Sequence, residues 1–147
     1  MGLAASIRRI AGAVLIMTVL GGATAPGSLD LDFEGLRSAK GLIQICLTAN
    51  PKGFPDCKAD SSAITRTLKA GQRSTRFDAL AAGDYAVSVI HDENANARLD
   101  TFAGIPREGF GFSRNPVITF GPPGFNSARF AVGTAPVKQT VRFRYFL

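Results

Sequence analysis

The stretch DYAVSVIHDENANARLDTFAGIPREGFGFS, residues 84–113, joins the clearest strand pattern of the chain to its densest group of side-chain oxygens. Side chains alternate between the two faces of a β-strand, so residues 84–91 predict a strand with an apolar face toward a core. That face carries Tyr85, Val87, Val89 and His91. A polar turn follows, and then a segment rich in glycine, proline and phenylalanine.

Further strand patterns lie on both sides of this stretch. Leu29, Leu31 and Phe33 alternate with acidic residues, and residues 41–48 form the continuous apolar run of a strand buried on both faces. The other predicted strands are residues 63–69, 72–77, 116–120, 128–132 and 137–146, with a hairpin or tight corner at residues 70–71. No segment has a convincing helical pattern. About seven to nine short strands separated by turns predict an all-β fold, a single antiparallel β-sandwich.

The N-terminus has the pattern of a secretory signal peptide. Arg8 and Arg9 precede an apolar run at residues 10–20, and small residues follow. Cleavage after Ala25 fits the usual small-residue pattern, but Pro26 is an unfavourable neighbour, so cleavage after Ala23 is an alternative, as is a retained anchor. The run is shorter than the roughly 20 residues of a membrane span. We therefore expect a signal peptide at residues 1–25, no stable membrane span after its removal, and one exported domain, periplasmic or secreted, at residues 26–147.

The charge of the chain does not indicate a nucleic-acid partner. Loss of Arg8 and Arg9 with the leader lowers the formal net charge from +6 to +4. The remaining basic residues are scattered, as on a solvated surface, and no recognised nucleic-acid module is present.

Cys46 and Cys57 are the two cysteines of the chain. In an exported protein such a pair predicts a disulfide, which for this short loop contributes roughly 2–4 kcal/mol. A metal site at the cysteines lacks partners, because the chain has one histidine.

The polar turn after the strand resembles a calcium-binding loop in its spacing. Asp92, Asn94, Asn96 and Asp100 match the first, third, fifth and ninth positions of an EF-hand-type loop, with the Arg98 carbonyl between the last two. Ala97 replaces the glycine of such a loop and Ala103 its closing glutamate, a role that Glu108 would have to take. Any Ca²⁺ site here would therefore be structural and weak, in the range of about 10⁻⁴–10⁻³ M. The alternative is that these residues build a turn through side-chain bonds to the backbone.

Two other groups of residues in this stretch are candidates for function. His91 is a candidate base of a small hydrolase with Asp92, Asp100 or Glu108, but Asp92 points to the opposite strand face, and a packed histidine is the alternative. Phe102, Phe110 and Phe112 belong either to the core under a long loop or, where exposed, to a surface for a ligand or partner.

Three runs of residues together resemble a known family. They are GDYAVSVIHDENANARLD (83–100), GIPREGFGFS (104–113) and FGPPGF (120–125). They are similar to bacterial family 2141 of the domains of unknown function, whose members are exported. The resemblance implies a secreted or periplasmic β-sandwich of the transthyretin-like or immunoglobulin-like kind, and it implies no established activity. Ala95 and Ala97 depart from the family pattern, where glycines are common, and we expect a stiffer loop.

These observations favour a non-enzymatic binding or structural module of the bacterial envelope. In that role the Asn/Asp loop would rigidify the chain and present residues 102–113 to an envelope protein or a small ligand. The small periplasmic hydrolase that uses His91 is the alternative.

Overall fold

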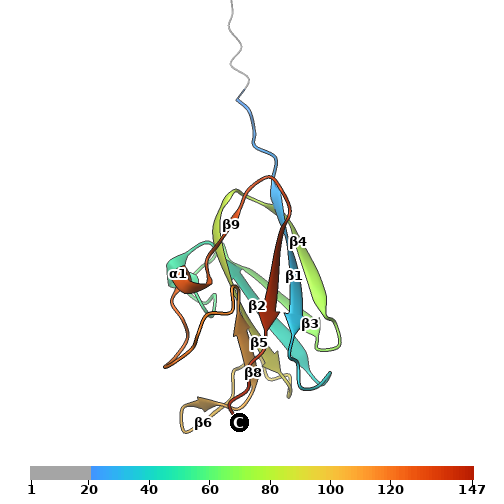
Figure 1. Ribbon diagram of the computed structural model, residues 1–147, viewed down its shortest axis with the longest axis vertical. Helices are drawn as coiled ribbons and strands as arrows, with labels where there is room; N and C mark the ends of the chain where they lie inside the picture. The colour runs from blue at the N-terminus through green and yellow to red at the C-terminus, as the bar shows by residue number, and fades with distance from the viewer. Residues whose placement is uncertain (1–20) are drawn as a thin grey trace, which may run out of the picture.

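Two β-sheets form the framework of residues 21–147, the part of the chain that the computed structural model describes (Figure 1). The predicted apolar run of the signal peptide, residues 10–20, lies outside the described residues. The first sheet contains β1 (Gly27–Glu34), β4 (Ser74–Leu80) and β10 (Val137–Arg142). The second contains β2 (Leu42–Thr48), β3 (Ile64–Lys69), β5 (Gly83–Asp92), β8 (Gly109–Phe112) and β9 (Phe130–Val132). The pair β6 (Thr101–Phe102) and β7 (Ile105–Pro106), a 3-10 turn at Pro51–Gly53 and the short helix α1 (Phe125–Ala128) complete the described elements.

The first sheet has the order β10-β1-β4. Its central strand alternates as predicted, with Leu29, Leu31 and Phe33 buried. On the other face, Asp30 pairs with Arg76 of β4 at 2.8 Å and Asp32 pairs with Lys138 of β10 at 2.7 Å. These pairs are open to solvent and contribute little, so burial of the apolar face orients the strand.

One pair of strands departs from the antiparallel expectation. β1 and β10 run parallel, with Leu29 beside Val137 and Phe33 beside Val141. Parallel neighbours need a long connection. Here that connection is the rest of the domain, because β1 and β10 are the first and last strands of the described chain.

The second sheet runs β3-β2-β5-β8, and β9 pairs with the start of β5. β3 and β4 follow each other in sequence but lie in different sheets, so the turn at residues 70–71 is a corner rather than a hairpin. β2 lies between β3 and β5, with Ile43, Ile45 and Leu47 in the core. On its other face Cys46 is buried, while Leu42 and Gln44 are half-buried.

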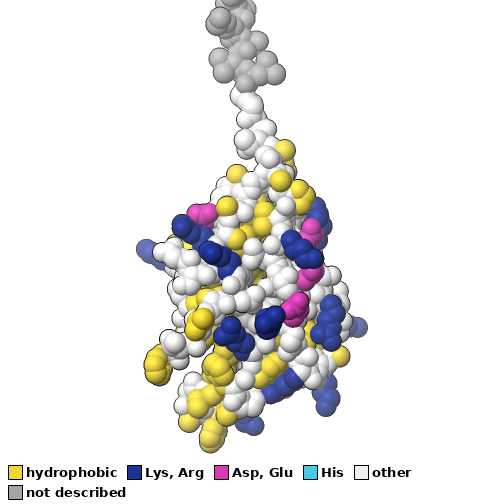
Figure 2. Space-filling view, viewed as in Figure 1, with side chains coloured by type: hydrophobic (Ala, Val, Ile, Leu, Met, Phe, Trp, Pro, Cys, Tyr) yellow, Lys and Arg dark blue, Asp and Glu magenta, His cyan; other side chains and the backbone are white. Residues whose placement is uncertain are grey.

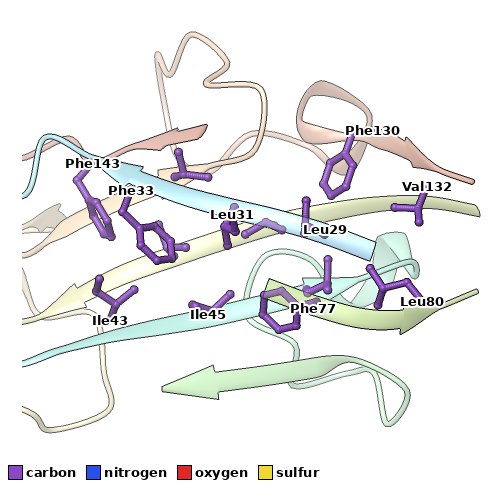
Figure 3. Close-up of a cluster of buried hydrophobic side chains, with 14 of the residues drawn as sticks. Leu29, Leu31, Phe33, Ile43, Ile45, Phe77, Leu80, Phe130, Val132 and Phe143 are labelled. Atoms are coloured by element: carbon purple, nitrogen blue, oxygen red, sulfur yellow. The ribbon is translucent and has the colours of Figure 1, made fainter. Parts of the chain in front are cut away.

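A hydrophobic core lies between the two sheets (Figure 3). Phe33 of β1 approaches Phe143, which follows β10, with ring centroids 6.1 Å apart. The other core residues include Leu29, Leu31, Ile43, Ile45, Leu47, Phe77, Leu80, Val87, Val89, Phe130, Val132 and Val141. Both sheets thus contribute to one core. The all-β prediction is confirmed, and this layout is consistent with the predicted sandwich.

A second, smaller cluster covers the outer face of β5. Ala86 lies on the face opposite to Val87, and it packs with Phe110 and Phe112 of β8 and with Ala128 of α1. Phe54, Ile118 and Phe125 pack against this cluster. The middle of β5 is therefore buried on both faces.

The predicted strand at residues 116–120 is wrong, because the chain there is an irregular loop. Arg114 and Asn115 both have positive φ and turn the chain away after β8. Asn115 then bonds the edge of β10, donating to the Thr140 carbonyl at 2.7 Å and accepting from the Arg142 amide at 2.8 Å. A side chain thus takes the hydrogen bonds that a further strand would need.

The last strand is shorter than predicted, since β10 ends at Arg142 rather than near residue 146. Arg144 instead forms a bridge with Phe110 of β8, so the C-terminal segment passes from the first sheet to the second. Within residues 21–147, no helix has both the length and the apolar character needed to cross a membrane.

Candidate functional site

A groove of about 880 Å³ lies over the outer face of the second sheet. Its floor includes Ile90 of β5 and Phe110 and Phe112 of β8. The loop after β5 borders the groove through residues 97–106, and the segment before α1 borders it through residues 118–122. Most of the lining is apolar, as in sites for small molecules.

Large apolar side chains stand exposed on or next to both bordering segments. Phe102 and Ile105 of the β6–β7 pair are 65% and 44% exposed, and Val117 and Phe120 are 84% and 97% exposed. Figure 2 shows hydrophobic side chains gathered at the lower left edge of the molecule, where β6 lies in Figure 1. Contiguous apolar exposure of this kind is typical of a binding surface.

The three phenylalanines that the sequence singles out differ in burial. Phe110 and Phe112 lie in the second cluster, only 7% and 6% exposed, and they line the groove. Phe102 is exposed and does not line the groove. The two interpretations of these residues, core and surface, therefore apply to different members.

Asp92 holds the loop that forms one side of the groove. Its side chain is fully buried at the end of β5. Oδ1 accepts from the Asn96 amide at 3.0 Å, and Oδ2 accepts from the Ala97 amide at 2.7 Å. These two bonds fix the backbone immediately before Arg98 and Leu99, which line the groove.

Asp100 and the two asparagines form a second set of bonds in this loop. Asn94 donates to Asp100 at 2.6 Å, and Asn96 donates to both Asp100 oxygens at 3.0 and 3.1 Å. The Asn96 and Asn94 side-chain amides favour the charged carboxylate and lower the pKa of Asp100 below its ordinary value.

Glu108 ties the two ends of the loop together. It is 5% exposed and precedes β8. One oxygen accepts from the Glu93 amide and the other from the Asp100 amide, each at 3.1 Å. The loop from residue 93 to residue 108 is therefore closed by a carboxylate that bonds only backbone donors.

The predicted calcium ligands thus lie in one bonded loop, and each of the five that would bind through a side chain accepts hydrogen bonds there. The side-chain bonds of Asp92, Asn94 and Asn96 to the backbone match the turn interpretation. The part of the chain that the structure describes holds no group of three or more His, Cys, Asp or Glu side chains placed for a metal ion. The calcium interpretation uses asparagine and main-chain oxygens as well as carboxylates. A structural Ca²⁺ at Asp92, Asn94, Asn96, Arg98, Asp100 and Glu108 stays a prediction.

Ala95 and Ala97 have positive φ, 56° and 61°. This is the left-handed backbone conformation that glycine adopts without a steric penalty, which explains why a glycine suits these positions. The bond from the Ala97 amide to Asp92 helps to hold the strained conformation.

His91 is fully buried on the core side of β5, next to Phe143 and Tyr145. Nε2 lies 2.8 Å from the Lys40 carbonyl oxygen, which can only accept, so Nε2 carries the proton. Nδ1 lies 2.7 Å from the Tyr145 hydroxyl and accepts a hydrogen bond from it, while that hydroxyl accepts a hydrogen bond from the Arg37 amide at 3.2 Å.

The carboxylate near His91 among the described residues is that of Glu93, 3.9 Å from Nδ1. The side chains of Asp92, Asp100 and Glu108 instead bond donors within the loop. His91 is thus buried and bonded at both ring nitrogens, and the three carboxylates named in the hydrolase hypothesis do not contact it.

Glycine is required in β8 because the C-terminal segment packs directly on it. A Cβ at Gly109 would lie 2.4 Å from Cε1 of Tyr145, and one at Gly111 would lie 2.6 Å from Cγ1 of Val141. The two glycines of the GFGFS run thus allow residues 141–145 to cover β8.

A second, polar cavity of about 530 Å³ lies on the other side of the loop. Arg37 donates to Glu93 at 2.7 and 3.2 Å and also to the Leu147 and Arg107 carbonyls. The Arg37 guanidinium lowers the pKa of Glu93 to about 2, with Ser38 adding a further hydrogen bond. The cavity also contains Asp100, Glu108 and the Arg107 side chain. Most of its charged groups are thus bonded within the protein.

The predicted disulfide Cys46–Cys57 is present, with 5.7 Å between the Cα atoms. It ties the loop at residues 50–60 to β2. In that loop, Phe54 contacts Phe112 with ring centroids 5.8 Å apart, and Pro55 lines the groove. The disulfide therefore supports one part of the groove.

Sequence reasoning missed several residues of the groove, including Ile90, Leu99 and Phe146, as well as the Arg37–Glu93 pair. Their positions depend on contacts between distant segments. One signal was available for the bordering segment: apolar side chains at Ile118 and Phe120 stand beside the turn-forming run GPPG.

Comparison with known proteins gives one match. A family model described as "Uncharacterized protein conserved in bacteria (DUF2141)" matches residues 31–140, from β1 to β10. No curated protein and no solved structure matches the chain.

Proposed function

The chain belongs to this bacterial family, and we propose that it is an exported, non-enzymatic binding protein that holds a small apolar ligand in its outer groove. The observation that carries the proposal is the groove itself. Its volume of about 880 Å³ lies within the range of about 300–1,000 Å³ common for small-molecule sites. Burial of apolar ligand surface there supplies the free energy of binding.

The way in which the walls of the groove are held supports a binding function over a purely structural one. Asp92 and Glu108, which are buried, fix the loop on one side, and the disulfide supports the loop that carries Pro55. A binding site with preformed walls loses less conformational entropy when a ligand enters.

The polar cavity is a weaker candidate. Arg37 and Glu93 bond each other, and both Glu108 oxygens bond the backbone, so a ligand there would have to break existing bonds. The burial of His91 between Tyr145 and the Lys40 carbonyl likewise argues against hydrolysis.

Export to the envelope is supported by two features. The signal-peptide pattern at residues 1–25 comes from the sequence alone. The disulfide Cys46–Cys57 suits an oxidising compartment such as the periplasm.

The test is a titration of the mature protein with N-phenyl-1-naphthylamine, a neutral fluorophore that brightens in apolar surroundings. We expect saturable binding that is weakened at least tenfold by Ile90→Lys, which places a charge in the groove floor. Leu99→Lys, on the loop, is a second variant in case the first does not fold.

Ile64→Lys is the matched control, because Ile64 is 37% exposed on β3 and does not line the groove. Circular dichroism and the thermal midpoint establish that each variant is folded. The proposal fails if the fluorophore does not bind, or if folded variants at Ile90 and Leu99 bind it as well as the Ile64 control does.

A further inference from the structure

We propose that the ligand of the groove is a single hydrocarbon chain with an anionic head group, such as a monomeric long-chain fatty acid, whose head pairs with one of the two cations of the lining, Arg98 or Lys58. This inference rests on the proposed function and adds the chemical class of the ligand. It follows from which groups of the lining are free to bond and which are not.

The floor of the groove suits a hydrocarbon chain, because its polar side chains are already hydrogen-bonded and offer little to the hydroxyl groups of a ligand. Its polar side chains are Gln44 of β2 and Ser88 of β5. Ser88 donates to the Pro55 carbonyl, and Gln44 accepts from Thr67 at 2.6 Å and donates to Asp92 at 3.4 Å. Across residues 21–147, every buried side-chain nitrogen and oxygen has a hydrogen-bond partner.

A sugar or peptide in the floor would therefore lose its hydrogen bonds to water and gain few in return, which costs free energy. Threonine hydroxyls do occur in the lining, at Thr65, Thr101 and Thr119, but these residues are exposed to solvent. A hydrocarbon chain meets no such cost.

The charged groups of the lining have a positive excess. They are Arg98, Lys58 and Asp56. Within the described residues, the Arg98 guanidinium takes part in no hydrogen bond or ion pair. Lys58 meets Asp56 at 3.8 Å, with the two side chains 84% and 55% exposed, and such a pair is weak and easily exchanged. The charge of Arg98 favours the nearby Asp100 carboxylate, but no hydrogen bond joins the two side chains. An anionic head group thus finds two exposed cations in the lining, one without a direct partner among the described residues and one loosely held.

The loop explains why Arg98 is held at the groove. The amides of Asn96 and Ala97, the residues just before it, bond the buried Asp92 carboxylate. Arginine also presents a planar set of donors that matches the two oxygens of a carboxylate. Arg98 is therefore a ligand-binding residue in this proposal, and Asp92 is a positioning residue.

The experiment compares a fluorescent C18 polyene fatty acid with the alcohol of the same chain, each below its micelle concentration, on the mature protein at pH 7.5. We expect the acid to bind about tenfold more tightly than the alcohol. Arg98→Gln with Lys58→Gln should remove that preference without weakening the alcohol. Arg73→Gln is the control, since Arg73 is exposed and lies outside the groove.

The outcomes separate this inference from the proposed function. Equal binding of acid and alcohol to the wild type, or a preference that survives in the double variant, overturns the anionic head group while the apolar groove stands. Absence of binding for both probes overturns both. Cosedimentation with phosphatidylglycerol vesicles without binding of the monomeric acid would instead make the exposed phenylalanines a membrane contact, and would overturn the proposal.

Discussion

Glu93 shows how one residue couples the stability of the loop to pH. Arg37 donates two hydrogen bonds to its carboxylate, Ser38 donates a third, and the pKa of Glu93 falls from 4.5 to about 2. A lowered pKa in the folded state means that the charged carboxylate stabilises the fold above pH 4.5. That contribution is lost as the pH falls from about 4.5 to about 2.

We therefore expect Glu93→Gln to destabilise the protein at pH 7 and to lose less stability than the wild type between pH 5 and pH 2. Urea unfolding at several pH values measures this difference. Glu34→Gln is the control, because the pair of Glu34 with Arg142 is long, 3.4 Å, and open to solvent. If the free energy of unfolding of Glu93→Gln falls in parallel with that of the wild type from pH 5 to pH 2, Glu93 does not couple stability to pH.

At the scale of an element, the loop from Asp92 to Glu108 is held by carboxylates that accept backbone hydrogen bonds. Asp92→Asn keeps the size of the side chain but replaces one acceptor oxygen with a donor. The Asn96 or Ala97 amide then loses its acceptor, at a cost of about 1–3 kcal/mol. We expect a lower free energy of unfolding and faster amide exchange at residues 96–97, with Asp56→Asn, in an exposed turn, as the control.

The same loop allows the calcium prediction to be tested by linkage. A site with Kd of about 10⁻⁴–10⁻³ M would stabilise the fold by about 1.4–2.7 kcal/mol in 10 mM Ca²⁺, which raises the thermal midpoint by several degrees. We expect that shift relative to EDTA if Ca²⁺ binds, and its loss in Asp92→Ala/Asp100→Ala. An unchanged midpoint would contradict the calcium prediction, and the Asn and Asp residues would then be explained by their hydrogen bonds within the turn.

Elements with a local signal could be predicted from the sequence. β1 alternates in burial along most of its length, the apolar face of β5 points to the core as its sequence pattern predicts, and β2 has the apolar run of a central strand. Residues 116–120 have a similar composition but form no strand, because Asn115 bonds the edge of β10 through its side chain. Strand formation there was decided by a neighbour about 25 residues away in sequence, which no local pattern reports.

At the scale of the whole molecule, the groove and the parallel pairing of β1 with β10 lay beyond sequence reasoning. The groove combines β2, β5 and β8 with three loops and the C-terminal segment, so its shape exists only after the chain has folded. The loop at residues 92–100 was found because its ligand-type residues are adjacent in sequence. Arg98 of this loop was noted for its carbonyl, and only the folded structure places the residue at the groove.

The disulfide, which forms in an oxidising compartment, supports a loop that packs against the groove. Cys57 holds the loop at residues 50–60 to β2, and Phe54 of that loop contacts Phe112 and Phe125, with ring centroids 5.8 and 6.2 Å apart. We expect Cys46→Ala/Cys57→Ala to lower the free energy of unfolding by about 2–4 kcal/mol and to weaken binding of the neutral fluorophore. Equilibrium unfolding and the titration are both measured with and without dithiothreitol.

Dithiothreitol should reproduce both effects in the wild type and change nothing in the double variant, which serves as its own control. If reduction lowers stability but leaves the affinity for the fluorophore unchanged, the loop at residues 50–60 stabilises the fold without shaping the groove. If neither quantity changes, the oxidising compartment is not needed for a folded, binding-competent protein. The argument for export would then rest on the signal-peptide pattern at residues 1–25 alone.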